Sequence, residues 1–477
     1  MSKFNNKPTE LTINREGHAA YAMTDKSKLV TEVLTSFFNE RKFYGDNSAE
    51  MEKTIRRVIA EDPDFVSRLA VFARREFNMR SVSHVLAAYL ANEPKGKLYA
   101  RRTVNGIVLR GDDVTELLAF YLSTFGKPLP NALRKGINDA FSRFDEYTLA
   151  KYKGAGRRVK MKDVPLLCHP APKDEDQADL WKRLIEDRLT PPLTWETQLS
   201  AKGNNRGTWE ELIDSGKVGY MALLRNLRNI LEAQPRNLNK VLKTLIDENA
   251  VRHSKQLPFR YLSAYREVMD MASSRVLNAL ETAVRISVDN LPKLPGTTVI
   301  AVDASGSMSA TLSQNSTVHC SDVGMLLGLI ANRICEDSLF YTFDTEIRQY
   351  PHTRHTPLLE TSVHSPYGGG TDIALPFMHM IRERLLPDRI ILLSDNECNR
   401  PRWGGMPVQA MADKYREKMQ NDLWVHAIDL QGYGTQQFAG RHTNIIAGWS
   451  EKVFDFILLA ERGEGALEST IAGYTWE

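Results

Sequence analysis

The sequence has little cysteine and no long apolar run. Four cysteines occur among its 477 residues, and no two of them form a C-x-x-C pair. Such scattered thiols exclude a disulfide-stapled scaffold and a zinc ribbon, which need more or closely spaced cysteines. No stretch of about 18 apolar residues is present, so no membrane-spanning helix is predicted. Residues 1–8 lack the apolar core of a secretory signal. We therefore expect a cytoplasmic protein with reduced thiols and no membrane contact.

The motifs that carry common hydrolytic and phosphoryl-transfer chemistry are also missing. The chain contains no G-x-x-x-x-G-K phosphate loop, no G-x-S-x-G nucleophile turn and no H-E-x-x-H zinc helix. We therefore expect a protein that is not an enzyme.

The distribution of charge divides the chain into two parts. Residues 1–294 hold 48 Lys and Arg against 37 Asp and Glu, a net charge of +11. Residues 295–477 hold 14 against 22, a net charge of −8. A basic part joined to an acidic part suggests that the first part binds a polyanion and the second does not.

Hydrophobic periodicity predicts a helical architecture for the first part. Apolar residues recur at helical spacing, and no strand-like alternation interrupts them before residue 290. The segments with this spacing are 65–73, 114–125, 132–144, 220–231, 238–246, 261–271 and 276–288. Helix pairs joined by short turns fit an α-solenoid, which we expect to span residues 1–292.

The second part begins after a linker at residues 290–296 that holds two prolines and a glycine. Beyond it, predicted strands and helices alternate. The strands are 299–302, 339–343, 390–394 and 423–429, and the helices are 323–334, 373–385, 408–419 and 451–462. This alternation predicts an α/β domain with a mostly parallel, doubly wound sheet at residues 296–477.

Five side chains with oxygen atoms lie just after predicted strands or a glycine run of this second domain. They are Asp303, Ser305, Ser307, Thr371 and Asp395. Asp303 and Asp395 each lie directly after a predicted strand, where open α/β sheets bind ligands, and Thr371 follows three glycines. An all-oxygen set suits a hard cation, Mg²⁺ first, with Ca²⁺ and Mn²⁺ as alternatives. The other interpretation is a turn that folds but binds nothing.

The spacing D-x-S-x-S, then Thr, then Asp resembles the metal-ion-dependent adhesion site of von Willebrand factor A (vWA) domains. The resemblance implies that Ser305, Ser307 and Thr371 touch the metal and that the two acids act directly or through water. It also implies one coordination position that stays open for a partner's carboxylate or for water. The chain departs from the family at Asn396, which stands where the family has glycine.

A basic segment lies at residues 151–162, with six positive charges, two glycines and no acid. A loop of this kind can bring its cations onto a phosphate backbone, where each contact releases counterions. Arg134 and Lys135 precede the segment, and Arg225 and Arg228 recur further on. The alternatives are a solvated loop without a partner and, for the last two arginines, salt bridges between helices.

Several segments of the chain resemble the TROVE module of the Ro autoantigen family. They are Phe77–Arg80, Leu149–Lys153, Cys168–Pro170, Met221–Asn229 and Pro258–Tyr265. Ro proteins follow this module with a vWA domain, so the resemblance covers nearly the whole chain. It implies a monomeric ring of HEAT-like helical repeats, closed by the vWA domain around a positively lined hole. It also implies noncatalytic binding of small noncoding Y RNAs and of the ends of misfolded RNAs. The implied role is RNA quality control, beside an exoribonuclease or an RNA-repair enzyme.

The resemblance assigns RNA contacts residue by residue. Lys151 matches a family lysine that contacts Y RNA, and His169 matches a histidine of the same surface. The family's arginine falls at Ala155 here, and Arg157 or Arg158 would take its role. The predicted RNA-binding residues are Lys151, Lys153, Arg157, Arg158, Lys160, Lys162, His169, Arg134, Lys135, Arg225 and Arg228.

Two other functions stay open from the sequence alone. One is a protein-interaction scaffold whose metal site docks an acidic partner. The other is a metal-dependent nuclease or phosphohydrolase, which would need a general base although Asp303 and Asp395 are already predicted ligands.

Tyr147 and Tyr152 flank the basic segment. We expect them to be core aromatics, with stacking on unpaired bases as the alternative.

Overall fold

The computed structural model describes most of the chain, which divides into two compact units. The described residues are 11–13, 19–35, 48–154, 158–192, 194–289, 291–311, 316–395, 408–431, 435–438, 442–447, 453–461 and 467–476. Unit 1 comprises Met1–Thr24 and Gln198–Leu467, and unit 2 comprises Asp25–Thr197 and Glu468–Glu477. None of the helices described in these ranges is long and apolar enough to cross a bilayer. Domain limits at residues 292–296 stay a prediction from the sequence pattern.

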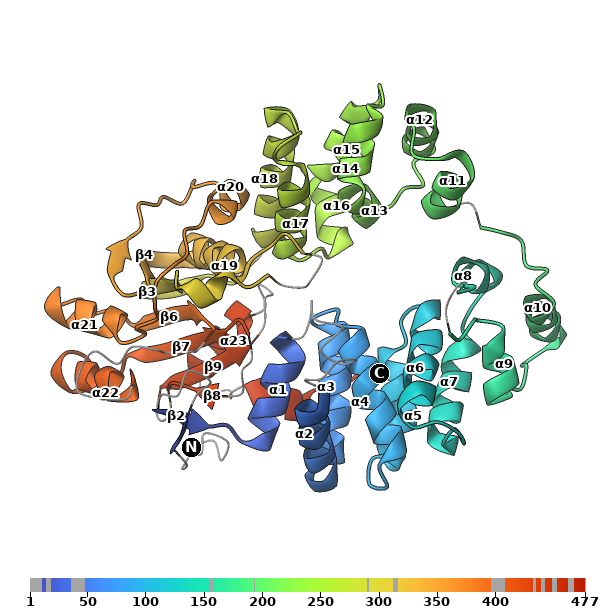
Figure 1. Cartoon of the computed structure of the whole chain (residues 1–477), viewed down its shortest axis with the longest axis horizontal. Helices are drawn as coiled ribbons and strands as arrows, with labels where there is room; N and C mark the ends of the chain where they lie inside the picture. The colour runs from blue at the N-terminus through green and yellow to red at the C-terminus, as the bar shows by residue number, and fades with distance from the viewer. Residues whose placement is uncertain are drawn as a thin grey trace. The chain divides into compact units, whose positions relative to one another are not determined.

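Unit 2 is built from helices that pack side by side (Figure 1). The helices are α1 (Asp25–Thr35), α2 (Ser48–Glu61), α3 (Pro63–Arg75), α4 (Ser81–Asn92), α5 (Lys97–Ile107), α6 (Gly111–Thr124), α7 (Asn131–Phe141), α8 (Glu146–Lys151), α9 (Asp163–Cys168) and α10 (Glu175–Ile185). At the start of α3, Asp62 accepts the Phe65 N–H at 3.1 Å, and Pro63 occupies the first turn, where no N–H donor is needed. Helix α4 is buried on nearly every side between α3, α5 and α6.

The chain segment after helix α24 (Leu467–Gly473) packs against the early helices of unit 2. The Tyr474 carbonyl accepts a hydrogen bond from Arg68 at 2.6 Å, and the Tyr474 hydroxyl donates to Glu76 at 3.0 Å. Trp476 lies so close to Gly106 that a Cβ there would approach the indole nitrogen to 2.7 Å. Residues almost 400 positions apart therefore share one packed surface.

The helices of unit 1 precede its large sheet in the sequence. They are α12 (Arg206–Asp214), α13 (Tyr220–Arg225), α14 (Leu227–Ala233), α15 (Leu238–Leu245), α16 (Glu248–Ser254), α17 (Pro258–Val268) and α18 (Ser274–Val288), and α11 (Trp195–Lys202) crosses the limit between the units. The periodicity at 220–231 is divided between two short helices that meet at Asn226. The Asn226 side-chain amide donates to the Ala222 carbonyl at 2.9 Å.

The sheet that follows is the predicted doubly wound one. Its order is β5-β4-β3-β6-β7-β9, and all neighbours are parallel except the edge strand β5. The strands are β3 (Leu294–Asp303), β4 (Cys335–Phe343), β5 (Ile347–Gln349), β6 (Arg389–Ser394), β7 (Trp424–Asp429) and β9 (Thr443–Ala447). The helices around it are α19 (Cys320–Ile334), α20 (Leu358–Val363), α21 (Leu375–Arg382), α22 (Val408–Lys418) and α23 (Val453–Glu461).

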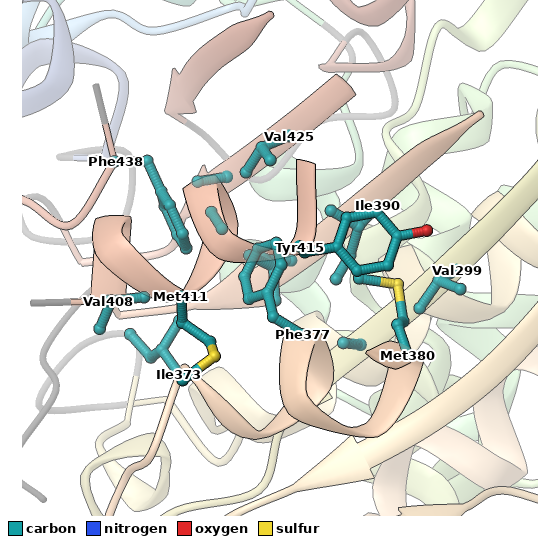
Figure 2. Close-up of a cluster of buried hydrophobic side chains, with 14 of the residues drawn as sticks. Val299, Ile373, Phe377, Met380, Ile390, Val408, Met411, Tyr415, Val425 and Phe438 are labelled. Carbon is teal, nitrogen blue, oxygen red and sulfur yellow. The ribbon is translucent and has the colours of Figure 1, made fainter. Parts of the chain in front are cut away.

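Alternate residues of the central strands pack on opposite faces of the sheet. One face meets α21 and α22, as Figure 2 shows for Val299, Ile390, Val425, Phe377, Met380, Met411 and Tyr415. The other face meets α19, which approaches so closely at Gly328 that a Cβ there would lie 2.7 Å from Val302 Cγ2. Burial on both faces explains the continuous apolar runs of these strands.

The expectation that no strand precedes residue 290 is wrong. Strands β1 (Leu11–Ile13) and β2 (Ala19–Ala22) form an antiparallel sheet with β8 (Thr435–Gln436), and all three belong to unit 1. Strands of two to four residues are too short to show alternation, and their pairing with a distant segment leaves no local signal.

Candidate metal centre and basic surface

The five predicted metal ligands lie around the carboxyl ends of β3 and β6. From β3 the chain first moves to β4 on one side, and later to β6 and β7 on the other side. This reversal of direction opens a crevice at the carboxyl edge of a parallel sheet, because the two connections leave in opposite directions. Asp303 is the last residue of β3, and Asp395 follows the last residue of β6.

The Asp303 carboxylate is held by hydrogen bonds from both neighbouring chain segments. Its Oδ1 accepts the Ser305 N–H at 2.8 Å, and its Oδ2 accepts the Ser394 hydroxyl at 2.6 Å. The hydroxyls of Ser305 and Ser307 are 3.1 Å apart. Asp303 and Ser305 are fully buried, whereas Ser307, in the short 3₁₀ helix Gly306–Ser309, is exposed. The first three predicted ligands therefore lie together, with one of them open to solvent.

The glycine run at residues 368–370 brings Thr371, the fourth predicted ligand, to the loop after β3. The Gly368 N–H donates to the Ala304 carbonyl at 2.7 Å, and the Gly306 N–H donates to the Gly369 carbonyl at 3.1 Å. Gly369 has a φ of +73°, a conformation that glycine adopts without strain. These bonds fasten the segment before Thr371 to the loop after β3, and Thr371 itself is buried.

The electrostatics of this centre fit a hard cation. Burial, followed by the neighbouring Asp395 carboxylate, raises the pKa of Asp303 well above its ordinary value. Two buried carboxylates repel each other unless a proton or a cation lies between them. In the described part of the chain, no three His, Cys, Asp or Glu side chains gather around a common point. The five predicted ligands are two carboxylates and three hydroxyls, which match the ligand chemistry of Mg²⁺.

Sequence reasoning missed the side chains around this centre. His319 and Tyr367 stack beside it with ring centroids 5.6 Å apart, and His319 Nδ1 lies 2.5 Å from the Ser309 carbonyl. Asp322, buried in the first turn of α19, accepts two hydrogen bonds from Arg266 of α17, at 2.7 and 3.1 Å. None of these contacts is visible in sequence spacing, because tertiary structure brings the partners together.

The described residues on either side of positions 155–157 in the basic segment approach each other in unit 2. The Met161 N–H donates to the Lys153 carbonyl at 3.2 Å. Lys151, Arg158 and Lys160 are exposed and make no ion pair within the described residues, and Arg157 lies outside them. Their charges therefore face solvent.

Two other lysines of the segment share one acid. Lys153 and Lys162 lie 3.3 and 3.7 Å from the Asp187 carboxylate, which comes from the turn after α10. The Asp187 side chain is 62% exposed and the two lysine side chains are about one third exposed, so water screens the pairs and they contribute little stability. Both lysines can therefore exchange Asp187 for another anion at small cost.

Arg134 and His169 both lie near Cys168, where α7 packs against the end of α9. His169 ends α9 in the left-handed conformation, with a φ of +52°, and its side chain is exposed. The Asn138 amide of α7 donates to the Cys168 carbonyl at 3.1 Å. Burial raises the pKa of the Cys168 thiol to about 12, although the nearby Arg134 guanidinium acts to lower it. Lys135, next on α7, is exposed.

Arg225 and Arg228 belong to unit 1 and differ from each other. Arg228 of α14 forms ion pairs with Glu232 at 3.0 Å and with Glu267 of α17 at 3.3 Å. The salt bridge between helices that the sequence left open is thus present for Arg228. Arg225, the last residue of α13, is exposed and has no ion pair among the described residues.

Family comparison then identifies the chain. The TROVE domain model matches residues 22–187 and 182–275, and the Ro60 vWA domain model matches residues 297–457. The chain belongs to the TROVE family. This confirms the resemblance drawn from the sequence, including the vWA domain that follows the TROVE module.

The relatives of this TROVE protein include RNA-binding protein RO60 of Caenorhabditis elegans, 24% identical over 48% of this chain and 38% of the relative. RNA-binding protein RO60 of Deinococcus radiodurans is 27% identical over 42% of this chain and 41% of the relative. Telomerase protein component 1 of Rattus norvegicus is 26% identical over 50% of this chain but only 12% of its own length. The matches thus span less than half of each relative.

A solved structure extends the comparison to nearly the whole chain. The crystal structure of the Deinococcus radiodurans RO (RSR) protein matches with a TM-score of 0.62 and 16% identity, over 94% of this chain and 99% of that one. At this identity the match concerns the fold alone. It confirms the predicted class, a helical region followed by a doubly wound α/β domain.

Proposed function

We propose that this TROVE protein is a noncatalytic RNA-binding protein and that the basic surface of unit 2 contacts the RNA. The observation that carries the proposal is the group of exposed cations on α7, on α8 and in the turn after it, without ion pairs in the described residues (Lys135, Lys151, Arg158 and Lys160). Unpaired, exposed cations gain most from a phosphate backbone, because each contact releases condensed counterions. The names of the RO60 relatives support the same ligand class.

The finer proposal concerns the RNA and its setting. Lysines and arginines on a surface contact phosphates and carry no direct sequence information. We therefore propose RNAs recognised by shape and by unpaired ends, namely Y-like noncoding RNAs and misfolded RNAs. The proposed setting is cytoplasmic quality control, with an exoribonuclease or an RNA-repair enzyme as the protein that acts on the RNA.

The metal centre has a separate role in this proposal. Asp303, Ser305, Ser307, Thr371 and Asp395 would hold one divalent cation, Mg²⁺ first. Such a cation supplies an open coordination position for an oxygen ligand of a partner protein. The acidic balance of residues 295–477 makes this part of the chain a poor surface for RNA.

The test replaces Lys151, Arg158 and Lys160 together by Ala and measures binding of a structured RNA hairpin over a range of salt concentrations. We expect affinity to fall on the order of 10-fold or more near 0.1 M salt. The slope of log affinity against log salt should fall by about 2 to 3, since about 0.7–0.9 is lost per phosphate contact.

The matched control removes three exposed positive charges elsewhere in unit 2. Lys53 lies on α2, Lys95 lies in the turn before α5, and Lys97 is the first residue of α5. This triple Ala variant has the same net charge as the first but should keep the wild-type salt slope. Equal losses from both variants would show that only net charge matters, and a wild-type affinity in the first variant would refute the assigned surface.

A further inference from the structure

Tyr147 and Tyr152, which the sequence could not tell apart, lie in different environments. Tyr152 packs against Gly111 at the start of α6, where a Cβ would lie only 2.8 Å from the tyrosine ring. The Arg110 guanidinium lies 5.2 Å from the centre of the same ring. Tyr147 is 51% exposed, so the expectation of a core aromatic is wrong for this residue.

Lys151 lies near both tyrosine rings. Residues 147 and 151 are one turn apart on α8, so their side chains share a face of the helix. Lys151 Nζ lies 5.7 Å from the centre of the Tyr147 ring and 5.6 Å from the centre of the Tyr152 ring. An open aromatic surface therefore lies directly beside an ammonium group that has no ion pair in the described residues.

The helix that carries Tyr147 is held in place. Asp145 caps α8 by accepting the Thr148 N–H at 2.8 Å. Glu146 pairs with Arg183 of α10 at 2.7 Å, and Arg183 also pairs with Asp179 of the same helix at 2.8 Å. The two acids next to Tyr147 are thus engaged in capping and pairing, which fixes the ring's support before any ligand arrives.

We propose that Tyr147 is a stacking platform for an unpaired RNA base, with Lys151 beside it to contact the adjoining phosphate. The proposal rests on the proposed RNA-binding function and adds the side chain through which this surface recognises an unpaired base. An aromatic ring stacks on any base that has left its duplex, whereas a paired base inside a helix offers no open face. The surface therefore favours RNA with a bulge, an internal loop or a free end over a continuous duplex.

The experiment compares two RNAs of equal length and charge, one fully paired and one with an internal loop of unpaired purines. The variants are Tyr147→Ala, Tyr147→Leu and Tyr147→Phe. Leucine keeps an apolar side chain without a ring, and phenylalanine keeps the ring without the hydroxyl. We expect Ala and Leu to weaken binding of the looped RNA about 10-fold, a typical cost of one lost base stack. Binding of the duplex should change less than about twofold, and Phe should match wild type on both RNAs.

A direct readout places 2-aminopurine in the internal loop. Its fluorescence should be quenched on binding to wild type and Tyr147→Phe, and remain high with Tyr147→Ala and Tyr147→Leu. Equal effects of each variant on both RNAs, or a Leu variant that behaves as Phe, would overturn the stacking assignment while RNA binding itself stands. A wild-type protein that binds neither RNA would instead refute the proposed function. Circular dichroism of each variant checks that the helices are intact.

Discussion

The two ends of strand β6 make an instructive comparison, because each carries buried charge. At its start, Arg389 donates two hydrogen bonds to the Glu461 carboxylate of α23, at 2.6 and 2.9 Å, and further bonds to Pro295 and Thr298. At its other end, Asp395 lies beside the carboxylate of Asp303. One end pairs a cation with an anion inside the chain, and the other brings two anions together.

The difference shows which buried charges stabilise the fold and which prepare a site. A buried ion pair is stable only while both members remain, because either charge alone is costly in an apolar interior. Two buried carboxylates gain their missing partner from outside, as a bound cation or a proton. The buried charge at the start of β6 is therefore structural, and the end of β6 is where we propose that a cation binds.

The largest expected effect comes from breaking the structural end. Glu461→Gln leaves the buried Arg389 guanidinium without its anion, and we expect unit 1 to lose about 3–5 kcal/mol of unfolding free energy. Urea denaturation measures the change.

The matched control is Glu383→Gln, which removes the same charge from an exposed pair with Arg382 at 2.8 Å. It should cost less than about 0.5 kcal/mol. Similar losses from both substitutions would mean that the Arg389–Glu461 pair is no more than a surface salt bridge.

Lowering the pH should also destabilise unit 1 at the start of β6, with a slightly smaller loss of unfolding free energy. Burial acts to raise the pKa of Glu461, but the hydrogen bonds from His426 and Arg389 outweigh it and lower this pKa to about 2. Burial lowers the pKa of His426. The Nδ1 atom of His426 faces the Asn444 amide. Both groups bind protons more readily in the unfolded chain, so both make the folded unit less stable as pH falls.

For His426 the loss begins below about pH 6.5, and for Glu461 it falls between about pH 4.5 and 2. The Glu461 contribution amounts to roughly 3 kcal/mol at about 1.4 kcal/mol for each pKa unit. Urea denaturation at a series of pH values measures it. Glu461→Gln should lack the step below about pH 4.5, and an identical step in that variant would assign it to other carboxylates.

The smallest effect concerns the binding end. Mg²⁺ should raise the unfolding free energy of the wild type by about 2.7 kcal/mol at 100 times its dissociation constant. Asp303→Asn, which removes a ligand charge, should abolish this response, whereas Asp337→Asn on the exposed part of β4 should keep it. Denaturation with Mg²⁺ and with a chelator measures the difference. A wild type that shows no response at millimolar Mg²⁺ would contradict the metal assignment.

The sequence predicted the large sheet well because its strands are buried on both faces and read as continuous apolar runs. The same pattern predicted which residues lie at the carboxyl edge of the sheet. Ser305 was expected just after a strand, and the structure places it just after β3. What the sequence could not supply is contact between distant segments. Asp187 pairs with Lys153 across 34 residues, and Arg266 reaches Asp322 across 56. The exposure of Tyr147 was hidden for the same reason, because it depends on which neighbouring helices cover α8.

The position of Tyr474 and Trp476 against residues 68–106 has a consequence for biosynthesis. The early helices leave the ribosome first, yet two aromatic side chains that complete their packing are made some 370 residues later. During translation the surfaces around Phe72 and Gly106 stay open to water or to a chaperone. A shortened transcript or a stalled ribosome should therefore yield a helical unit that is recognisably incomplete and readily degraded.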